Sequence, residues 1–408
     1  MKKMIMVALA FALFGCGGGG TAVKKSQEPG QDATKAKFQT FIAREANGLK
    51  PAQAGGDLKI TVLSKGKPKT TISSKAKPVQ YDITIPIGAS LDVACYLTEE
   101  MSSPAVVLKS VFDNIVKVPG IESAGFKTLE ADIFTNVGYL YLEAEYLTKD
   151  KKYGTAKIVA VSTVNVSFYC THDELGYKKT FLKVADSLAN SAYVQKFVTD
   201  FSGYKQKQID IAYVNNMAVG YAESYQFSGE DKTRKNFSFS TFLIPRSTKE
   251  LMSGDSVDTT VYDEETGALL SGAYNSYENN EAEHEIEFEQ VGPTRYKARG
   301  ALQGKNFEKT FDSEKALVYS GYIVDQYSAG KTTNREWSFE EYVPQSPVKP
   351  TKSRVVLKET MPNGGKKIEY TFHTLKALLE VDGKSYTSMN LDMGSVTFLL
   401  KRKFLDAQ

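Results

Sequence analysis

Hydrophobic and polar residues alternate along much of the chain after residue 57. The clearest runs of this kind occupy residues 57–64, 90–97, 129–147 and 155–170. Alternation with a period of two places the apolar side chains on one face of a β-strand. The charged segment TKDKKYG, which separates the last two runs, predicts a hairpin. The pattern therefore predicts a mainly β (α+β) protein, built from an antiparallel meander with curved sheets or from an open barrel.

Two segments have helical rather than strand periodicity. In residues 102–118, Ser103 is placed to cap a helix and Pro104 to occupy its first turn. A second helix is expected to open at Asp173. Its predicted apolar face consists of Tyr177, Phe181, Val184 and Leu188. We expect both amphipathic helices to pack on the N-terminal half of the fold.

The layout of a helix followed by a long hairpin occurs twice. Each hairpin carries Val-Gly-Tyr in its first strand, at residues 137–139 and again at 219–221. Glycine inside a strand often marks a bulge or a sharp bend, so Gly138 and Gly220 are predicted to bend their strands. An internal duplication is one interpretation of this layout, and not the favoured one.

From about residue 255 the helical period disappears, and turn residues recur at short intervals. Asn-Gly at 363–364 and Asp-Gly at 382–383 are typical of two-residue turns between antiparallel strands. Charged residues alternate with apolar ones at 283–290, so one face of that strand is expected to meet water. The apolar face of this meander must pack on helices, on another sheet or around a ligand.

The N-terminus has the organisation of an export signal. Lys2 and Lys3 precede an unbroken apolar run at residues 4–14, and the small residue Gly15 follows it. A transmembrane helix needs about 20 apolar residues, and this run is much shorter. The segment is therefore expected to be a signal that is removed.

The tetrapeptide LFGC at residues 13–16 resembles the lipobox of bacterial lipoproteins, with Phe14 in place of the usual small residue. The resemblance implies that Cys16 is acylated and anchors the protein in a membrane. Gly17, rather than Asp, implies the outer membrane, on its periplasmic face or at the cell surface. An ordinary secretory signal with an incidental cysteine is the alternative.

We divide the chain into four expected parts. Residues 1–15 are the signal peptide, and residues 16–37 are a lipidated flexible tether, because they contain no apolar residue larger than valine. An α+β domain is expected at 38–250, beginning with a short helix at 38–49. A β-meander domain is expected at 251–408, with a fold continuous across residue 250 as the alternative.

Two cysteines remain after Cys16. Cys95 and Cys170 each end an alternating run a few residues before a helix-like segment, and exported proteins form disulfides. We favour a disulfide between them. Two buried free thiols are the alternative.

The charge balance and the histidines exclude several classes of function. The 51 basic and 48 acidic residues are interspersed, which argues against a nucleic-acid partner. His172, His284 and His373 have no partners at metal-ligand spacing, so no metal and no cofactor are expected. No Walker loop, G-x-S-x-G or H-E-x-x-H motif occurs.

Three charged clusters each have two interpretations. His172 beside Asp173 and Glu174 could act as a general base, but the favoured interpretation is that Asp173 or Thr171 caps the following helix, with Glu174 in its first turn. The acidic run at 278–289 lacks the spacing of a calcium loop and is interpreted as a solvated strand face. The lysine-rich segment at 65–78 is a surface for anionic lipid or, as we favour, a solvated hairpin loop.

These observations favour a non-enzymatic binding or structural lipoprotein of the outer membrane, which recognises a protein or glycan in the cell envelope through strand edges and tyrosine-rich loops. The alternative is a carrier or receptor for an apolar ligand such as a lipid. A second alternative is an envelope hydrolase. The sequence leaves the oligomeric state open.

Overall fold

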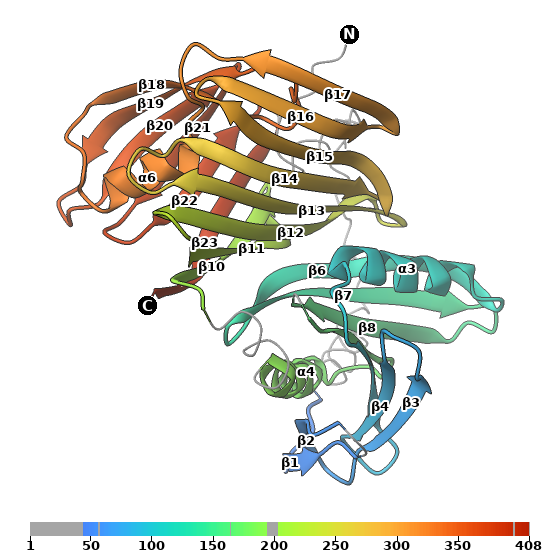
Figure 1. Ribbon diagram of the computed structural model, residues 1–408. Coiled ribbons are helices and arrows are strands. Elements are labelled where there is room, and N and C mark those ends of the chain that lie inside the picture. The colour runs from blue at the N-terminus through green and yellow to red at the C-terminus, as the bar shows by residue number, and fades with distance from the viewer. Residues whose placement is uncertain (1–43, 56–57, 164, 194–202, 395, 408) are drawn as a thin grey trace, which may run out of the picture.

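The computed structural model describes residues 44–55, 58–163, 165–193, 203–394 and 396–407. Their strands form three antiparallel sheets, of two, seven and fourteen strands (Figure 1). The mainly β fold with antiparallel sheets is confirmed, and none of the sheets closes into a barrel.

The two N-terminal sheets contain nine strands. β1 and β2 form a hairpin, and the seven-stranded sheet has the order β3-β4-β5-β9-β8-β7-β6. Their bounds are β1 (Lys50–Gln53), β2 (Thr61–Ser64), β3 (Lys69–Ser74), β4 (Gln80–Pro86), β5 (Asp92–Thr98), β6 (Ile121–Phe134), β7 (Val137–Thr148), β8 (Tyr153–Ser162) and β9 (Ser167–His172).

The helix α3 (Pro104–Lys117) begins directly after Ser103, whose side chain accepts a hydrogen bond from the Val106 amide at 3.0 Å. Leu108 and Phe112 on its apolar face are fully buried. The helix lies between the seven-stranded sheet and the larger sheet, because it contacts β6 to β9 on one side and β12 and β13 on the other (Figure 1).

The helix α4 (Lys178–Ala192) begins five residues later than expected. Its N-cap is Tyr177, in the left-handed conformation and without a side-chain cap, so Asp173 does not open the helix. Glu45, which is distant along the chain, caps the helix instead. Its carboxylate accepts hydrogen bonds from the amides of Lys179 at 3.1 Å and Thr180 at 2.7 Å. Glu45 itself lies in a segment without helix at 44–49, so the short helix expected at 38–49 is wrong there, and residues 38–43 lie outside the described part.

The fourteen-stranded sheet is assembled from two meanders. β10 to β17 run outward from the middle of the sheet, the chain then crosses to the opposite edge, and β18 to β23 run back until β23 pairs with β10. The strand bounds are β10 (Gln206–Val214), β11 (Met217–Ser228), β12 (Thr233–Ser247), β13 (Glu250–Asp263), β14 (Leu269–Glu278), β15 (Glu281–Gly292), β16 (Arg295–Leu302), β17 (Lys305–Asp312), β18 (Glu336–Glu341), β19 (Thr351–Thr360), β20 (Lys366–Phe372), β21 (Leu375–Val381), β22 (Tyr386–Asp392) and β23 (Thr397–Ala407).

This sheet is strongly curved, so that its two halves face each other across a concave side (Figure 1). The helix α6 (Ser320–Ser328) lies on that concave side, with Ile323 and Tyr327 buried. The expectation that helices end before residue 255 is therefore wrong. The α6 segment is only nine residues long and has no side-chain cap, so tertiary packing rather than a local signal stabilises it.

The residues just before α6 connect the two halves of the sheet. The Leu269 amide donates to the Leu317 carbonyl at 2.7 Å, and the Val318 amide donates to the Glu340 carbonyl at 2.8 Å. Residues 317–318 thus join the start of β14 to the end of β18.

The boundary expected at residue 250 falls inside this sheet. β13 begins at Glu250 and pairs with β12 before it and with β14 after it. The change of sheet occurs earlier, between α4 and β10. Sequence periodicity did not reveal where the chain passes from one sheet to the other, because strands of both sheets have the same alternating pattern.

The two Val-Gly-Tyr strands, β7 and β11, lie in different sheets. The register of β10 and β11 shifts beside Gly220, which agrees with the bend expected there. No register shift accompanies Gly138, where Gly138 pairs with Ile133 in a regular ladder. A bulge therefore does not account for the bend expected at Gly138.

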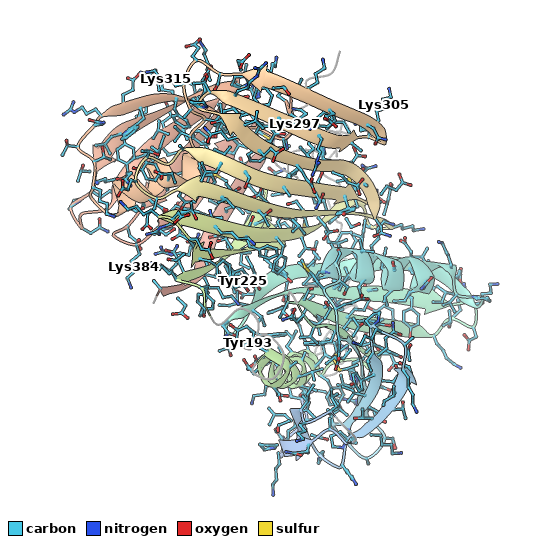
Figure 2. The ribbon with its side chains drawn as sticks, in the orientation of Figure 1. Tyr193, Tyr225, Lys297, Lys305, Lys315 and Lys384 are labelled. Carbon is cyan, nitrogen blue, oxygen red and sulfur yellow. A yellow bond between two sulfur atoms is a disulfide. The ribbon has the colours of Figure 1, made fainter. Side chains whose placement is uncertain are left out.

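A buried ion pair lies at the junction of the two larger sheets. Lys207 on β10 and Glu223 on β11 are separated by 3.4 Å between Nζ and Oε2, and both side chains are fully buried. Lys207 also donates to the carbonyl of Asn136, in the turn between β6 and β7, at 2.5 Å. Its Nζ lies 4.8 Å from the ring centroid of Tyr193 and 5.2 Å from that of Tyr225, the two tyrosines labelled at this junction in Figure 2. Burial lowers the pKa of Lys207, and Glu223 opposes that effect.

Candidate ligand-binding cavity

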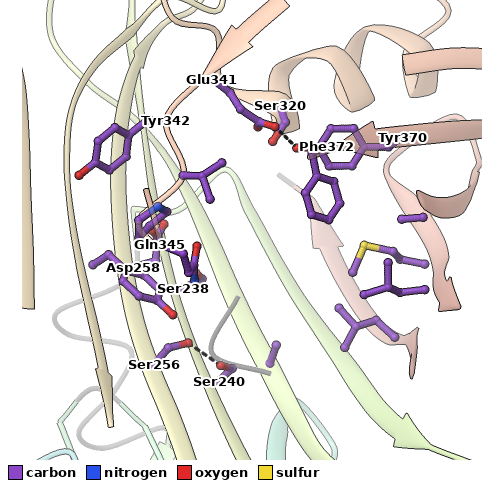
Figure 3. A pocket seen from close by; sticks show the side chains of 18 of the residues that line it. Ser238, Ser240, Ser256, Asp258, Ser320, Glu341, Tyr342, Gln345, Tyr370 and Phe372 are labelled. Atoms are coloured by element: carbon purple, nitrogen blue, oxygen red, sulfur yellow. Dashed lines mark hydrogen bonds between the residues drawn. The ribbon is translucent and has the colours of Figure 1, made fainter. Parts of the chain in front are cut away.

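A cavity of about 360 Å³ lies on the concave side of the fourteen-stranded sheet (Figure 3). Strands from both halves of the sheet line it, together with the start of α6 and the segment after β18. A volume of this size lies within the usual range of small-molecule sites, about 300 to 1,000 Å³.

One wall of the cavity is polar and belongs to β12 and β13. Ser238 pairs with Asp258, and Ser240 pairs with Ser256, in the antiparallel register of these strands. Residues two apart on a strand share a face, so these two cross-strand pairs form one patch. The hydroxyl oxygens of Ser240 and Ser256 are 2.7 Å apart and hydrogen-bonded (Figure 3).

The facing wall is apolar and belongs to β20 to β23. Ala377, Leu391 and Phe398 lie side by side on three successive strands, because each is the register partner of the next. Met389 and Leu400 form a second such row on β22 and β23. All five line the cavity, as does Phe372, which Figure 3 shows across from Ser238 and Asp258. The cavity therefore has an amphipathic lining.

The carboxyl group of Glu341 lies at one end of the cavity and has several hydrogen-bond partners within the protein. It accepts hydrogen bonds from the hydroxyls of Ser353 and Tyr370. Burial raises the pKa of Glu341, although these hydrogen bonds oppose the shift. Glu341 is thus held in place by the protein itself.

Asp258 has fewer partners. Its Oδ1 accepts a hydrogen bond from the Thr260 hydroxyl at 3.1 Å. Burial raises the pKa of Asp258 to about 6, against the opposing effect of Thr260. Asp258 is therefore an ionisable group in the wall of a mainly apolar cavity, a feature that often marks a functional site.

The cysteines expected to pair do so. Cys95 on β5 and Cys170 on β9 form a disulfide, and they are direct register partners on neighbouring strands. Both are buried in the core of the seven-stranded sheet, far along the chain from the strands that line the cavity. Cys16, the expected lipid attachment site, lies outside the described residues.

His172 is held in a structural setting. Its Nδ1 lies 2.9 Å from the backbone carbonyl oxygen of Asp92, and its ring contacts those of Tyr177 and Phe181. Burial lowers the pKa of His172 and thus favours the neutral imidazole. His284 Nδ1 is hydrogen-bonded to the Ser276 hydroxyl at 2.8 Å, and His373 Nε2 lies 3.3 Å from that of Thr351. The structure does not bring the three histidines together, and within its described part no three metal-ligating side chains gather.

The charged segments lie on the surface. β15 carries the acidic run, with Glu285, Glu287 and Glu289 exposed and the alternate positions His284, Ile286 and Phe288 buried. The lysine-rich segment includes β3, an edge strand of the seven-stranded sheet. It is thus a strand with its flanking turns rather than a loop alone.

Sequence reasoning did not find the residues of the cavity. The signal that was present is the alternation of phenylalanine with serine in NFSFSTF at 236–242, and Asp258 in the neighbouring strand. Small polar side chains on one face of a strand look the same whether that face meets bulk water or a cavity. Only the curvature of the sheet distinguishes the two.

No known family model matches the sequence, and no curated protein sequence matches it. Among solved structures, the chain is similar to a β-barrel-like protein of a domain of unknown function from Brucella abortus. The similarity has 9% sequence identity and a TM-score of 0.41, and it covers 50% of this chain and 98% of that one. None of the helices within the described ranges is long and apolar enough to cross a membrane.

Proposed function

We propose that this protein is a lipoprotein of the outer membrane that binds a small, largely apolar ligand on the concave side of its fourteen-stranded sheet. The observation that carries the proposal is the cavity of about 360 Å³ between a polar wall on β12 and β13 and an apolar wall on β20 to β23. Ligand sites in proteins are typically concave and mainly apolar, with a few polar groups that orient the ligand.

The amphipathic lining supports an amphiphilic ligand. The rows that contain Leu391 and Leu400 offer a surface for a hydrocarbon chain, whereas Ser238, Ser240 and Asp258 offer hydrogen-bonding groups on the facing wall. Burial of apolar surface contributes about 0.8 kcal/mol for each methylene group. Each methylene group that packs on these rows is thus expected to increase the affinity.

The anchoring part of the proposal rests on the lipobox-like LFGC at residues 13–16. Acylation of Cys16 would tether the body to the membrane through residues 16–37. Replacement of Cys16 by serine is expected to abolish incorporation of labelled palmitate and to release the protein from the membrane fraction. Palmitate incorporation that persists in this variant would contradict the assignment.

Native mass spectrometry of the gently purified protein, followed by organic extraction, tests the binding function. We expect a stoichiometric apolar adduct. The variant Ala222→Phe places a ring in the cavity, because Ala222 pairs with Ser240 and lines the same wall, and it should lose the adduct. The matched control is Ala282→Phe, at an exposed alanine on β15, which should retain it. A protein that folds and never carries or takes up an apolar molecule would contradict the proposal.

A second candidate function is recognition of an envelope glycan or protein, and one observation favours it. The rings of Tyr96 on β5 and Tyr169 on β9 stack with centroids 4.7 Å apart, and Tyr96 is 40% exposed. Exposed aromatic side chains are enriched where proteins bind partners. The variant Tyr96→Ala is then expected to weaken binding of envelope polysaccharide, whereas Ala282→Phe, on the other sheet, leaves it unchanged. Equal binding by both variants would remove this candidate.

A further inference from the structure

The charge of the cavity wall bears on the chemistry of the ligand, and the following inference rests on the proposed binding function. No lysine, arginine or histidine occurs among the described residues that line the cavity. Two carboxyl groups do, those of Asp258 and Glu341. The electrostatics of the site are therefore set by acidic groups.

The two carboxyl groups differ in what they offer to a ligand. Glu341 is 4% exposed and is engaged by Ser353 and Tyr370. Asp258 accepts one hydrogen bond, from Thr260 to Oδ1, and within the described part of the chain no donor reaches its Oδ2. A carboxylate has about four acceptor positions, so Asp258 retains most of its capacity.

Asp258 is half-buried. A carboxylate that is partly withdrawn from water without a counter-charge is costly, and a cation that arrives with the ligand removes this cost. An ammonium group supplies both the charge and N–H donors, and charge-assisted hydrogen bonds are about twice as strong as neutral ones. The carboxylate or phosphate of a fatty acid or phospholipid would instead place a second negative charge beside Asp258, and like charges disfavour each other's ionisation.

Gln345 also lines the cavity, and its Nε2 is buried without a hydrogen-bond partner among the described residues. A carboxamide carries both a donor and an acceptor, so Gln345 orients a polar group without selecting the sign of its charge. Asp258 is therefore the group that selects the ligand by its charge. Figure 3 shows Asp258 and Ser238 on the wall that faces Phe372, so a head group at Asp258 leaves the apolar wall to the tail.

We infer that the ligand is a cationic amphiphile, an alkyl chain with an ammonium head, whose nitrogen pairs with Asp258 and whose chain packs on β20 to β23. Since one water occupies about 30 Å³ of liquid, the cavity of about 360 Å³ accepts roughly a dozen non-hydrogen atoms. A ten-carbon chain with a small head group has this size.

Calorimetric titration with three probes of equal chain length tests the inference: decylammonium, decanol and decanoate at pH 7. The full chain is used with Cys16→Ser, so that no attached lipid competes. We expect decylammonium to bind at least about tenfold more tightly than decanoate, with decanol between them. Equal affinities, or tighter binding of decanol or decanoate, would overturn the inference while leaving the binding function intact. Failure of all three probes to bind would count against both the cationic ligand and the proposed binding function.

The variant Asp258→Asn locates the effect. It preserves the shape of the side chain and removes its charge, so it should lower the affinity for decylammonium about tenfold and leave that for decanol unchanged. The control is Glu289→Gln at an exposed position of β15 outside the cavity, which should change neither affinity. Decylammonium selectivity that survives Asp258→Asn would refute the role of Asp258. The comparison of the three probes on the otherwise unchanged chain remains decisive if this variant does not fold.

Discussion

Gly138 on β7 lies directly against the ring of Tyr221 on β11, so that the glycine of one Val-Gly-Tyr tripeptide contacts the tyrosine of the other. A Cβ atom at position 138 would stand 2.3 Å from Cδ2 of Tyr221. The Gly138 amide also donates a hydrogen bond to Glu223 Oε1 at 2.8 Å. The absence of a side chain at Gly138 thus allows the seven-stranded and fourteen-stranded sheets to approach each other here.

The variant Gly138→Ala is therefore expected to destabilise the protein by about 3 kcal/mol, the upper part of the range for overpacked cores, because the new methyl group would clash with the fully buried ring of Tyr221. Urea denaturation monitored by circular dichroism measures this change. The matched control is Gly383→Ala, where a Cβ meets no atom within 4 Å and the backbone does not require glycine. Equal stability of the two variants would contradict the close approach.

Loss of one partner of the buried Lys207–Glu223 pair should destabilise the folded protein. Lys207→Met leaves Glu223 buried without its counter-charge, and such changes typically cost about 3 to 5 kcal/mol. Tyr225 still donates to Glu223 Oε2 at 2.6 Å, which favours the lower part of that range.

The double variant Lys207→Met/Glu223→Gln separates charge from packing. It should recover part of the stability lost in Lys207→Met, since no unpaired charge remains. The free energies of unfolding of the original protein, Lys207→Met, Glu223→Gln and the double variant give the coupling between the two residues. Strict additivity would show that the pair does not act as a unit.

Reduction of the Cys95–Cys170 disulfide should destabilise the fold. The bridge spans 75 residues, and the loss of loop entropy in the unfolded chain then corresponds to about 4 kcal/mol. Unfolding with and without a reductant measures the effect. The double variant Cys95→Ala/Cys170→Ala should have the stability of the reduced protein and should not respond to the reductant.

The buried Asp210 on β10 should make stability depend on pH. Burial raises the pKa of Asp210 to about 6, although hydrogen bonds from Tyr386 and Gln208 oppose the shift, whereas the ordinary value is 3.8. The folded state therefore binds more protons than the unfolded state between these values. The contribution of Asp210 is fully favourable below about pH 4 and is lost as pH rises through 6, at about 1.4 kcal/mol for each unit of pKa difference.

The isosteric variant Asp210→Asn should therefore gain stability relative to the original protein as pH rises from 4 to 7. Asp382→Asn provides a control of opposite sign. Partial burial opposes the shift at Asp382, but hydrogen bonds from Arg402 and two backbone amides lower its pKa to about 2. The original protein should thus lose the contribution of Asp382 as pH falls from about 4 toward 2. Parallel pH profiles for Asp210→Asn and the original protein would contradict the assignment to Asp210.

Local signals in the sequence determined the strands, most of the turns and one helix. Alternation predicted strands wherever one face meets the core, as in β5 and β15. The pair Ser103-Pro104 determined the start of α3, because capping depends on atoms only three residues apart. The two cysteines at the ends of alternating runs became direct partners, Cys95 with Cys170.

Tertiary structure decided the features whose cause lies far away along the chain. α4 begins where Glu45 reaches the amide of Thr180, and no residue next to Lys178 supplies that cap. α6 exists because the concave side of the sheet buries Ile323 and Tyr327. Gly138 serves a contact with a strand more than eighty positions later rather than a bulge in its own.

The cavity belongs to the same group of features. A period of two reports that Ser238 and Ser240 share a face of β12, but it reports neither that Asp258 on β13 lies beside them nor what lies opposite that face. The apolar wall comes from β20 to β23. These strands lie opposite β12 and β13 only because β23 pairs with β10 and the sheet curves back. The position of the half-buried Asp258 in the cavity wall, and with it the chemistry of the site, is a consequence of that curvature and not of any local pattern.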